Sequence, residues 1–461
     1  MSRGDTMALR DYMIKIVDPR IPDYIYSMFP SISEDVEKLQ RIYTMYRIGN
    51  DTQYSQLYFM FHREARIITK VLSFKVDPEK NIILCFLPIE YPLILPLDLT
   101  NCSTPEELHE LLSKPIVVDV VFRKGYLIAQ KLQAGTFKTS TDIAKELWEE
   151  VGASVLLYAL GLKPHWKLFT LYLPRYLGLF KGFQNEYETK PYYPIHVMQF
   201  SPPATGKSTF ADRIESAFNY EHLGGEFPSL TRLIGDARSG SVGIVGLRDG
   251  VIFDEFDKVT YQVKQEFITM QKDLQTGMEQ GKWKRGKGGK APTVYKYVNF
   301  IVFGNNNKII DIRNSRQAIL SLYDIEGFDA FIDRFTIVDN VREKISIMEH
   351  RIGRVLPNHI LRGLVDYLQS LMKPVTPSVE LKGRLLRHYI NFRAFLEVLN
   401  ISPPDNMVVE ILKGDSSFTE FYPADSSLID KYLKQVDLTP VSKPEPALEE
   451  EKETEKEITK T

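Results

Sequence analysis

The stretch between residues 195 and 218 limits the possible folds more than any other part of the chain. An apolar run, Ile195 to Phe200, leads into Ser-Pro-Pro-Ala-Thr-Gly-Lys-Ser-Thr, and a helical pattern, Phe210 to Phe218, follows directly. A strand, a glycine-containing loop and a helix in this order place backbone N–H groups and a helix N-terminus around a bound phosphate. The sequence therefore predicts an α/β domain with a phosphate site at this loop.

The loop fits the phosphate-binding pattern GxxxxGK[ST] at all but one position, because Ser201 stands where the first glycine is expected. The pattern predicts that Lys207 reaches the β- and γ-phosphates of ATP and that Ser208 holds a Mg²⁺ ion. Two alternatives stay open: a proline-rich turn with Lys207 in solvent, or a nucleotide site in which Ser201 lowers turnover. The residues predicted to line the nucleotide are Ser201, Pro202, Pro203, Ala204, Thr205, Gly206, Lys207, Ser208 and Thr209.

Two carboxylates follow a second apolar run. Gly250 to Phe253 leads straight into Asp254 and Glu255, the order in which a buried strand delivers acids to its carboxyl end. In such a site Asp254 would hold the Mg²⁺ ion or its waters, and Glu255 would orient and deprotonate the attacking water. An acidic helix cap, to which Asp257 would belong, is the competing interpretation.

Two further side chains are candidates for the hydrolysis step. A third apolar run, Val298 to Phe303, ends in a glycine and three asparagines, of which we expect Asn305 to position the water; a plain turn is the alternative. Arg334 ends a short helical stretch before another apolar run, Thr336 to Val338. Its guanidinium would stabilise transition-state charge on a neighbouring subunit's nucleotide, or else form a surface salt bridge.

A basic segment lies between the acids and the Asn305 strand. Five basic residues there surround three glycines and a tryptophan, and a hairpin of this kind can bind DNA phosphates without reading the sequence. Trp283 would stack on a base or pack at the base of the hairpin. A solvated turn is the alternative for the whole segment. The predicted DNA contacts, including one from a second small loop, are Lys282, Trp283, Lys284, Arg285, Lys287, Lys290 and Arg238.

The order of these motifs resembles that of MCM replicative helicases. Asp254-Glu255-Phe256-Asp257-Lys258 is similar to their Walker B signature, and Met278-Glu279-Gln280 is similar to the segment before their sensor-1 asparagine. The chain also resembles the Lon-like AAA+ protein of BREX phage-defence systems, in Gly243 to Asp249 and in Gly281 to Gly286. The resemblance covers roughly Thr141 to Leu399.

The resemblance implies a fold, a cofactor and an assembly. The expected fold class is α/β: an AAA+ P-loop ATPase core with a parallel sheet and a helical lid, preceded by a β-rich N-terminal domain. ATP with Mg²⁺ and a self-assembled ring, hexameric or larger, are implied, with the basic hairpin in the central channel. Arg334 matches the arginine finger, and Arg393 matches the sensor-2 arginine of the lid. The chain departs from both families, because it lacks cysteines for a zinc ribbon and room for a protease domain, so neither is expected.

The remaining sequence predicts five segments. Strand-rich runs between Tyr54 and Lys138 place a helix and a β-rich domain, which can close as a small barrel, in residues 1–138. A helical linker with a predicted helix from Thr141 to Leu160 covers residues 139–194. The ATPase core follows in residues 195–340, the helical lid and C-terminal segment in 341–437, and an acidic disordered tail in 438–461.

Composition excludes several classes of protein. The longest apolar stretch, Val151 to Leu162, is shorter than the ~20 residues that cross a bilayer, and the N-terminus has no apolar signal region. Two cysteines, Cys85 and Cys102, cannot build a four-ligand zinc site. We therefore expect a cytoplasmic protein without membrane or zinc. The net charge of −2 argues against a uniformly basic surface, so DNA binding must depend on local basic clusters.

Two hypotheses about function follow. In the first, the chain is a ring-forming, ATP-dependent DNA motor, an MCM-like helicase or translocase that acts in DNA replication, in a mobile element or in defence. In the second, it is an AAA+ protein remodeller or nucleotide-gated switch that binds no DNA and grips a protein through its N-terminal domain. DNA-stimulated ATP hydrolysis is expected only in the first case.

Overall fold

The computed structural model describes residues 9–13, 64–69, 71–87, 91–113, 116–134, 140–183, 193–225, 228–236, 241–258, 273–284, 293–323, 325–420 and 433–434. The predicted tail, 438–461, lies outside these residues. Among the residues that are described, no helix combines the length and the apolar character needed to cross a bilayer.

The centre of the predicted ATPase core is a five-stranded sheet in which all neighbouring strands are parallel. The strand order is β10-β13-β16-β9-β17, so the strand before the phosphate loop, β9, is flanked by β16 and β17. Three of these strands were predicted from their apolar runs, and β10 was not. The strands are β9 (Val197–Ser201), β10 (Tyr220–Gly224), β13 (Gly250–Asp254), β16 (Asn299–Asn305) and β17 (Ile337–Asn340).

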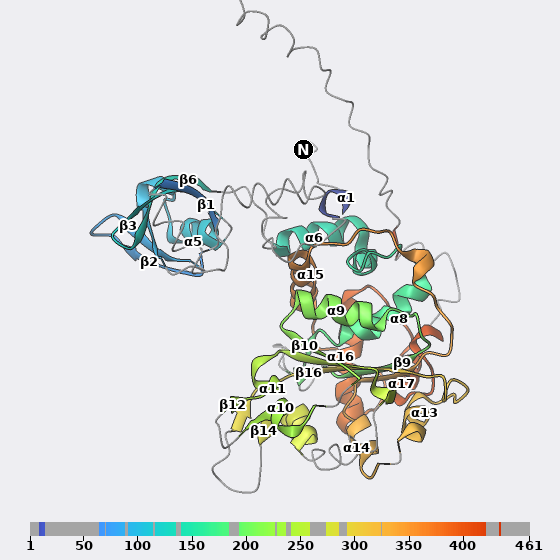
Figure 1. Ribbon diagram of the computed structural model, residues 1–461. Helices are drawn as coiled ribbons and strands as arrows, with labels where there is room; N and C mark the ends of the chain where they lie inside the picture. Colours follow the sequence, from blue (N-terminus) through green and yellow to red (C-terminus); the bar gives the residue numbers. More distant parts are fainter. Residues whose placement is uncertain are drawn as a thin grey trace, which may run out of the picture.

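Both faces of this sheet are buried, which explains why its strands are apolar without alternation. In β16, Ile301 and Phe303 contribute to one hydrophobic cluster, whereas Phe300 and Val302 contribute to the other. Figure 1 shows helices on both sides of the sheet. The first cluster also contains residues of α6 (Ser140–Val151), α7 (Val155–Tyr158), α8 (Trp166–Leu177), α9 (Lys207–Ala217), α15 (Asn358–Leu371), α16 (Gly383–Val398) and α17 (Asp405–Lys413). The second cluster also contains residues of α10 (Leu230–Ile234), α11 (Ile244–Leu247), helix 273–280, α13 (Ser315–Leu322) and α14 (Phe328–Ile332).

The predicted helix Thr141 to Leu160 is interrupted. It ends as α6 at Val151, and a short 3₁₀ turn, Gly152–Ser154, leads into α7. Gly152 has φ +58°, a left-handed conformation that glycine adopts without steric cost and that an α-helix cannot include. The apolar spacing continued across this break because both pieces are buried in the same cluster.

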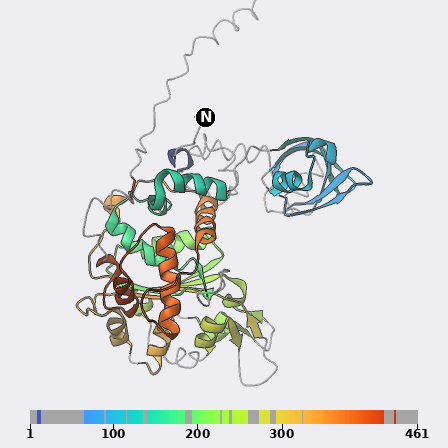
Figure 2. The same cartoon turned by 180° about the vertical axis from the view of Figure 1, so that it is seen from behind.

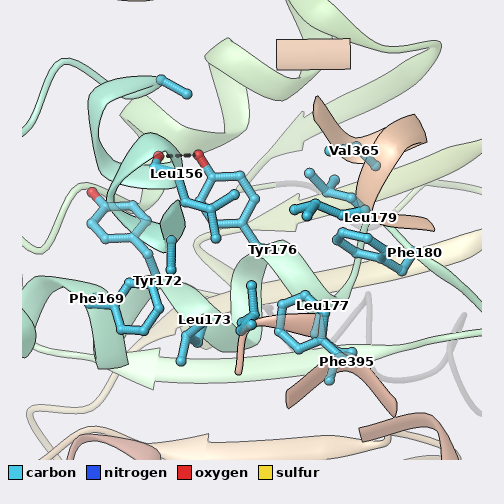
Figure 3. Close-up of a cluster of buried hydrophobic side chains, with 14 of the residues drawn as sticks. Leu156, Phe169, Tyr172, Leu173, Tyr176, Leu177, Leu179, Phe180, Val365 and Phe395 are labelled. Carbon is cyan, nitrogen blue, oxygen red and sulfur yellow. Dashed lines mark hydrogen bonds between the residues drawn. The ribbon is translucent and has the colours of Figure 1, made fainter. Parts of the chain in front are cut away.

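Helix α8 is the buried centre of the linker. Figure 3 shows its Tyr172, Leu173, Tyr176 and Leu177 among side chains from α7, α15 and α16, and the Tyr176 hydroxyl donates a hydrogen bond of 2.6 Å to the Leu156 carbonyl. From behind, one orange helix of the C-terminal part crosses in front of the sheet (Figure 2), and Phe395 and Leu396 of α16 belong to the same hydrophobic cluster as sheet residues. Residues of the predicted linker and lid therefore share one hydrophobic cluster with strands of the parallel sheet.

The β-rich domain has its own core. Its six strands have the order β1-β5-β6-β4-β3-β2, antiparallel except for the parallel pair β4 and β6. The described strands curve around α5 (Pro105–Ser113) in Figure 1, with β1 and β2 at the two edges. The predicted run Ile67 to Phe74 includes residues of two strands, β1 and β2, which are the two edges of the sheet. The strands are β1 (Glu64–Thr69), β2 (Ser73–Asp77), β3 (Ile82–Phe86), β4 (Leu93–Pro96), β5 (Ile116–Arg123) and β6 (Tyr126–Ala134).

Three short antiparallel pairs and one short helix complete the described elements. The pair β14 and β15 belongs to the basic segment and lies directly before β16 in the chain. Their bounds are α1 (Leu9–Tyr12), β7 (Lys181–Gly182), β8 (Tyr193–Pro194), β11 (Gly235–Asp236), β12 (Ser241–Val242), β14 (Lys282–Lys284) and β15 (Thr293–Tyr295).

Candidate nucleotide site

The predicted nucleotide and metal residues meet at the carboxyl edge of the parallel sheet. Asn305 at the end of β16 pairs in register with Ser201 at the end of β9, and Asp254 ends β13 beside them. The Ser208 hydroxyl donates a hydrogen bond of 2.5 Å to Asp254 Oδ2. Ser208 and Asp254 are therefore in direct contact, as the predicted Mg²⁺ site requires.

The phosphate loop has the backbone that its glycine requires. Gly206 has φ +74°, a left-handed conformation, and a Cβ atom added there would collide with the Tyr172 hydroxyl. Ala204 also has a positive φ of 66°. Helix α9 begins at Lys207, so its unpaired N–H groups face the loop, which is the arrangement that binds phosphate.

The Lys207 ammonium lies inside the loop. It donates to the carbonyl oxygens of Ser201 at 3.0 Å and Pro202 at 3.1 Å, and the side chain is only 8% exposed. Burial, together with the nearby charge of Arg175, lowers the pKa of Lys207 to about 8. A buried cation at this position is suited to an anionic ligand such as a nucleotide phosphate.

Ser201, which stands where the usual loop pattern has its first glycine, has a structural role. The Ser201 hydroxyl shares a hydrogen bond of 2.7 Å with Thr205 Oγ1 and lies 3.3 Å from Lys207 Nζ. The Thr205 hydroxyl also donates to the Pro202 carbonyl at 3.1 Å. Ser201 thus fixes both ends of the loop, which a glycine in its place would not do. The hypothesis that Ser201 lowers turnover remains a prediction.

Asp254 is arranged to be a charged metal ligand. Besides Ser208, its carboxylate accepts the Glu255 amide at 2.9 Å, and His222 Nε2 lies 3.7 Å away. Burial alone raises the pKa of Asp254, but the interactions with His222, Ser208 and the Glu255 amide outweigh burial, so the pKa is lowered. A hydroxyl and a carboxylate oxygen are ligands that Mg²⁺ prefers, and the pair therefore fits a bound Mg²⁺.

Glu255 occupies a strained position directly after the strand. Its φ is +56°, an uncommon left-handed value for a residue with a side chain, and such conformations occur often at functional sites. Its carboxylate is 41% exposed and pairs with Lys258. It also lies beside Gly225, where an added Cβ would come within 3.3 Å of Glu255 Oε2. The carboxylate is therefore accessible at the edge that carries the loop.

Asn305 is tied to the acidic segment through Asp257. The Asn305 backbone N–H donates to Asp257 Oδ1 at 2.7 Å, and its side-chain amide lies 3.4 Å from both Asp257 oxygens. Asp257 thus links the ends of β13 and β16. Asp254 is the last residue of a buried strand, whereas Glu255 directly precedes the 3₁₀ turn Phe256–Lys258 and Asp257 lies within that turn.

Two residues that the sequence analysis missed complete the surroundings of the site. His222, on the unpredicted strand β10, bridges Asp212 at 3.0 Å and Asp254. The interaction with the Asp254 carboxylate raises the pKa of His222. Burial lowers this pKa, but by less. No sequence pattern marked this histidine, because Glu221 and His222 hide the apolar character of β10.

Arg175 is the second missed residue. It is fully buried in α8, with its guanidinium carbon 4.4 Å from the centre of the Tyr172 ring. Its Nη1 donates to the Thr205 carbonyl at 3.1 Å, and its Nε donates to Gln199 Oε1 at 2.7 Å. A single arginine deep in the apolar run of α8 was the signal that sequence reasoning passed over.

The contacts of Arg175 continue into a buried polar network. The Gln199 amide donates to Asp339 Oδ2 at 3.0 Å, and Asp339 Oδ1 accepts the Ser417 hydroxyl at 2.7 Å. Burial raises the pKa of Asp339. The network therefore joins the phosphate loop, two sheet strands and the segment that follows α17.

The two predicted arginines have partners in their own chain. Arg334 is 7% exposed, and its guanidinium pairs with Glu279 at 3.3 Å and donates to the Gln275 carbonyl at 3.2 Å. Arg393 donates to the Pro403 carbonyl at 2.6 Å. Within its own chain, Arg334 therefore forms an ion pair. Its side chain is largely buried, whereas the alternative from the sequence was a surface salt bridge. The roles of finger and sensor-2 arginine stay predictions.

The predicted DNA contacts are only partly described. Trp283 is completely buried, and its indole N–H donates to the Lys296 carbonyl at 2.8 Å, so it packs at the base of the hairpin and cannot stack on a base. Lys282 is half-buried, with its ammonium 5.8 Å from the centre of the Tyr295 ring. Lys284 ends β14, but its side chain is not described. Outside the described residues lie Arg238, Arg285, Lys287 and Lys290.

Comparison with known proteins identifies the ATPase part. Residues 193–348 match the family described as Lon-like protease BrxL-like, ATPase domain. The chain is 26% identical over 387 residues to the uncharacterized protein ORF426 of Acidianus filamentous virus 1 (isolate United States/Yellowstone), covering 77% of this chain and 87% of that protein. It is 25% identical over 398 residues to the uncharacterized protein ORF425 of Acidianus filamentous virus 2 (isolate Italy/Pozzuoli), with coverage of 79% and 88%.

A third relative is the uncharacterized protein 440 of Sulfolobus islandicus rod-shaped virus 1, 26% identical over 412 residues, with coverage of 83% and 89%. All three similarities extend well beyond the matched ATPase segment, so they include flanking parts of the chain. Together with the sheet-edge site, the match of residues 193–348 supports an ATPase domain of the AAA+ type, similar to that of the BrxL-like proteins.

Proposed function

We propose that the protein is a ring-forming, ATP-driven DNA motor, an MCM-like helicase or translocase. The observation that carries the proposal is the continuity of the basic hairpin with the strand that ends in the nucleotide site. The hairpin β14–β15 leads within a few residues into β16, and β16 ends at Asn305, which is hydrogen-bonded to Asp257. A change at the nucleotide can therefore be passed along one strand to a DNA-binding element.

The hairpin is firmly attached to that strand. The Lys296 N–H donates to the Gly281 carbonyl at 2.7 Å, and the Lys296 ammonium pairs with Asp249 at 2.9 Å at the start of β13. Trp283 packs 5.9 Å, centre to centre, from Phe300 of β16. A displacement of β16 relative to β13 would consequently move the hairpin as well.

The chemistry of the site supports hydrolysis of ATP. Lys207 and the N-terminus of α9 would bind the phosphates, and Ser208 with Asp254 would hold Mg²⁺. When bound, Mg²⁺ neutralises charge on the phosphates and on the leaving group. Glu255 would orient the attacking water and accept its proton, and the Asn305 amide would position the same water.

Ring formation and biological setting are parts of the same proposal. Arg334 would act at a neighbouring subunit's nucleotide, which requires self-association, and a hexamer is the assembly that the MCM-like order of motifs favours. The three relatives are proteins of filamentous and rod-shaped viruses. Replication of a virus or another mobile element is therefore the setting that we favour over defence.

The competing proposal is a protein remodeller or switch that binds no DNA. The separate core of the β-rich domain favours it, because a folded module joined to an ATPase can hold a protein partner. The two proposals differ in one respect that is simple to measure: only the DNA motor has an ATPase rate and a mobility on gels that respond to DNA.

The test is a gel shift with single- and double-stranded DNA, using the Glu255→Gln variant to trap ATP. We expect an ATP-dependent shift, and Lys284→Ala combined with Arg285→Ala should weaken binding and flatten its salt dependence, by about one in the slope per lost phosphate contact. Lys163→Ala combined with Lys373→Ala, which removes two exposed lysines elsewhere, is the matched control. A protein that hydrolyses ATP but neither shifts DNA nor responds to it would favour the remodeller.

A further inference from the structure

The hairpin presents two different faces. Register pairs Lys282 with Tyr295 and Trp283 with Val294, and successive side chains of a strand point to opposite faces. Trp283 is completely buried and Val294 packs against the same core. The opposite face therefore carries Lys282 and Tyr295 as a cross-strand pair.

Tyr295 is unusually exposed for an aromatic side chain. At 72%, its exposure is the largest of any large hydrophobic side chain in the described part of the chain. The Lys282 ammonium lies 5.8 Å from the centre of its ring, within range of a cation–π interaction. An apolar ring and a positive charge thus stand side by side on a solvent-facing surface.

The base under this pair is rigid. Trp283 fills the space beside Gly277, where an added Cβ atom would collide with the indole ring, and its N–H bond to Lys296 ties β14 to the strand opposite. A fixed aromatic platform loses little conformational entropy when a ligand stacks on it. The exposure of Tyr295 is therefore a feature of a firmly packed hairpin.

We propose that Tyr295 stacks on a base of single-stranded nucleic acid, while Lys282 contacts the adjacent phosphate. The inference rests on the proposed DNA-binding function, and it moves the stacking role from Trp283, which is buried, to its neighbour on the open face. Stacking on a tyrosine tolerates any base, because every base has a flat aromatic surface. Bases inside a duplex are already stacked, so the contact favours single strands.

The experiment measures binding of fluorescein-labelled oligo(dT) by anisotropy, in the Glu255→Gln background with ATP. Tyr295→Ala should weaken binding about 5- to 100-fold with an unchanged salt slope, because stacking releases no counterions. Tyr295→Phe, which keeps the ring, should bind within about twofold of the parent. Lys282→Ala should weaken binding and lower the salt slope by about one. Leu371→Ala, which shortens an exposed side chain on α15, serves as the surface control.

The possible failures are distinguishable. If Lys282→Ala weakens binding and Tyr295→Ala does not, the stacking role is wrong while DNA binding stands. If Tyr295→Ala changes the assembly size in light scattering, the exposed ring is a subunit contact instead. If the parent protein binds no oligo(dT) at all, the proposed DNA function fails and the inference fails with it.

Discussion

At the residue scale, the clearest pH-sensitive group lies in the core under the hairpin. His196 is completely buried; its Nδ1 accepts the Phe300 N–H at 3.1 Å, and its Nε2 faces the Met278 carbonyl at 3.3 Å. Only the neutral ring with the proton on Nε2 satisfies both partners. Burial accordingly lowers the pKa of His196 to about 3.

This geometry predicts a stability that falls in acid. Because the pKa of His196 is lower in the folded chain than its ordinary value of 6.5, the unfolded chain binds the proton first as the pH falls. The free energy of unfolding should drop by about 1.4 kcal/mol per pH unit between pH 6.5 and pH 3 from this residue alone. His388, whose pKa burial also lowers to about 3, adds a similar slope.

Urea unfolding followed by tryptophan fluorescence between pH 4 and pH 7 measures this slope, since Trp283 belongs to the same hydrophobic cluster as Phe300, and Trp148 and Trp166 pack against the other cluster of the sheet. His196→Gln keeps one acceptor and one donor without a titrating group, so its slope should be smaller by about 1.4 kcal/mol per pH unit. His350→Gln, at a half-buried position, is the comparison variant. Equal slopes in the parent and in His196→Gln would contradict the account.

A site residue could be predicted from the sequence when its role follows from its place next to a strand or within a loop motif. Asp254 was predictable because it ends an apolar strand, and Lys207 and Ser208 were predictable because they belong to a loop motif that follows another apolar strand. Parallel strands bring such ends together. Arg175 and His222 were not predictable, because they reach the site through tertiary packing from α8 and β10. For Trp283 the sequence left two roles, stacking on a base or packing at the base of the hairpin. Which face of a hairpin a side chain occupies can be predicted only when the register of its strands is known.

At the element scale, helix α8 belongs to the nucleotide site although it precedes the matched ATPase segment. Arg175 supports the loop through the Thr205 carbonyl, and the Tyr172 hydroxyl lies 3.4 Å from the same oxygen. Removal of a buried charged hydrogen bond usually costs about 1.5–3 kcal/mol. The ATPase unit should therefore need residues upstream of 193.

Arg175→Leu should weaken binding of a fluorescent ATP analogue by about 10- to 100-fold, with a smaller effect on the hydrolysis rate at saturation. Arg175→Lys keeps the charge but not the two-pronged contact, so its affinity for the ATP analogue should lie between those of the parent protein and Arg175→Leu. Arg232→Leu, at an exposed position, is the control. Circular dichroism melting identifies any variant that fails to fold; a folded Arg175→Leu protein that binds nucleotide normally would exclude the supporting role.

The elements themselves were predictable where apolar runs end at polar residues. That signal gave β9, β13, β16 and α9 within a few residues. Strand β10 was missed, because it lies at the sheet edge and carries Glu221 and His222. The break at Gly152 was missed because helical spacing continues on both sides of it.

At the scale of the whole molecule, the linker, the sheet and the lid share one hydrophobic core, and the network from Arg175 to Ser417 crosses it. The β-rich domain has a separate core. The strand order β10-β13-β16-β9-β17 could not be read from the chain, because β16, which lies next to β9 in the sheet, is the third strand of the sheet after β9 in sequence. Sequence order alone does not fix spatial order in a parallel sheet.

The central claim is that Lys207, Ser208, Asp254 and Glu255 together bind and hydrolyse magnesium ATP at the carboxyl edge of this sheet. Phosphate release by the parent protein, by Glu255→Gln and by Lys207→Ala, measured beside ATP binding, tests it most directly. We expect Glu255→Gln to bind ATP like the parent but to hydrolyse it about 10²- to 10⁴-fold more slowly, and Lys207→Ala to lose binding. Phosphate release by Glu255→Gln at the rate of the parent protein would contradict the account.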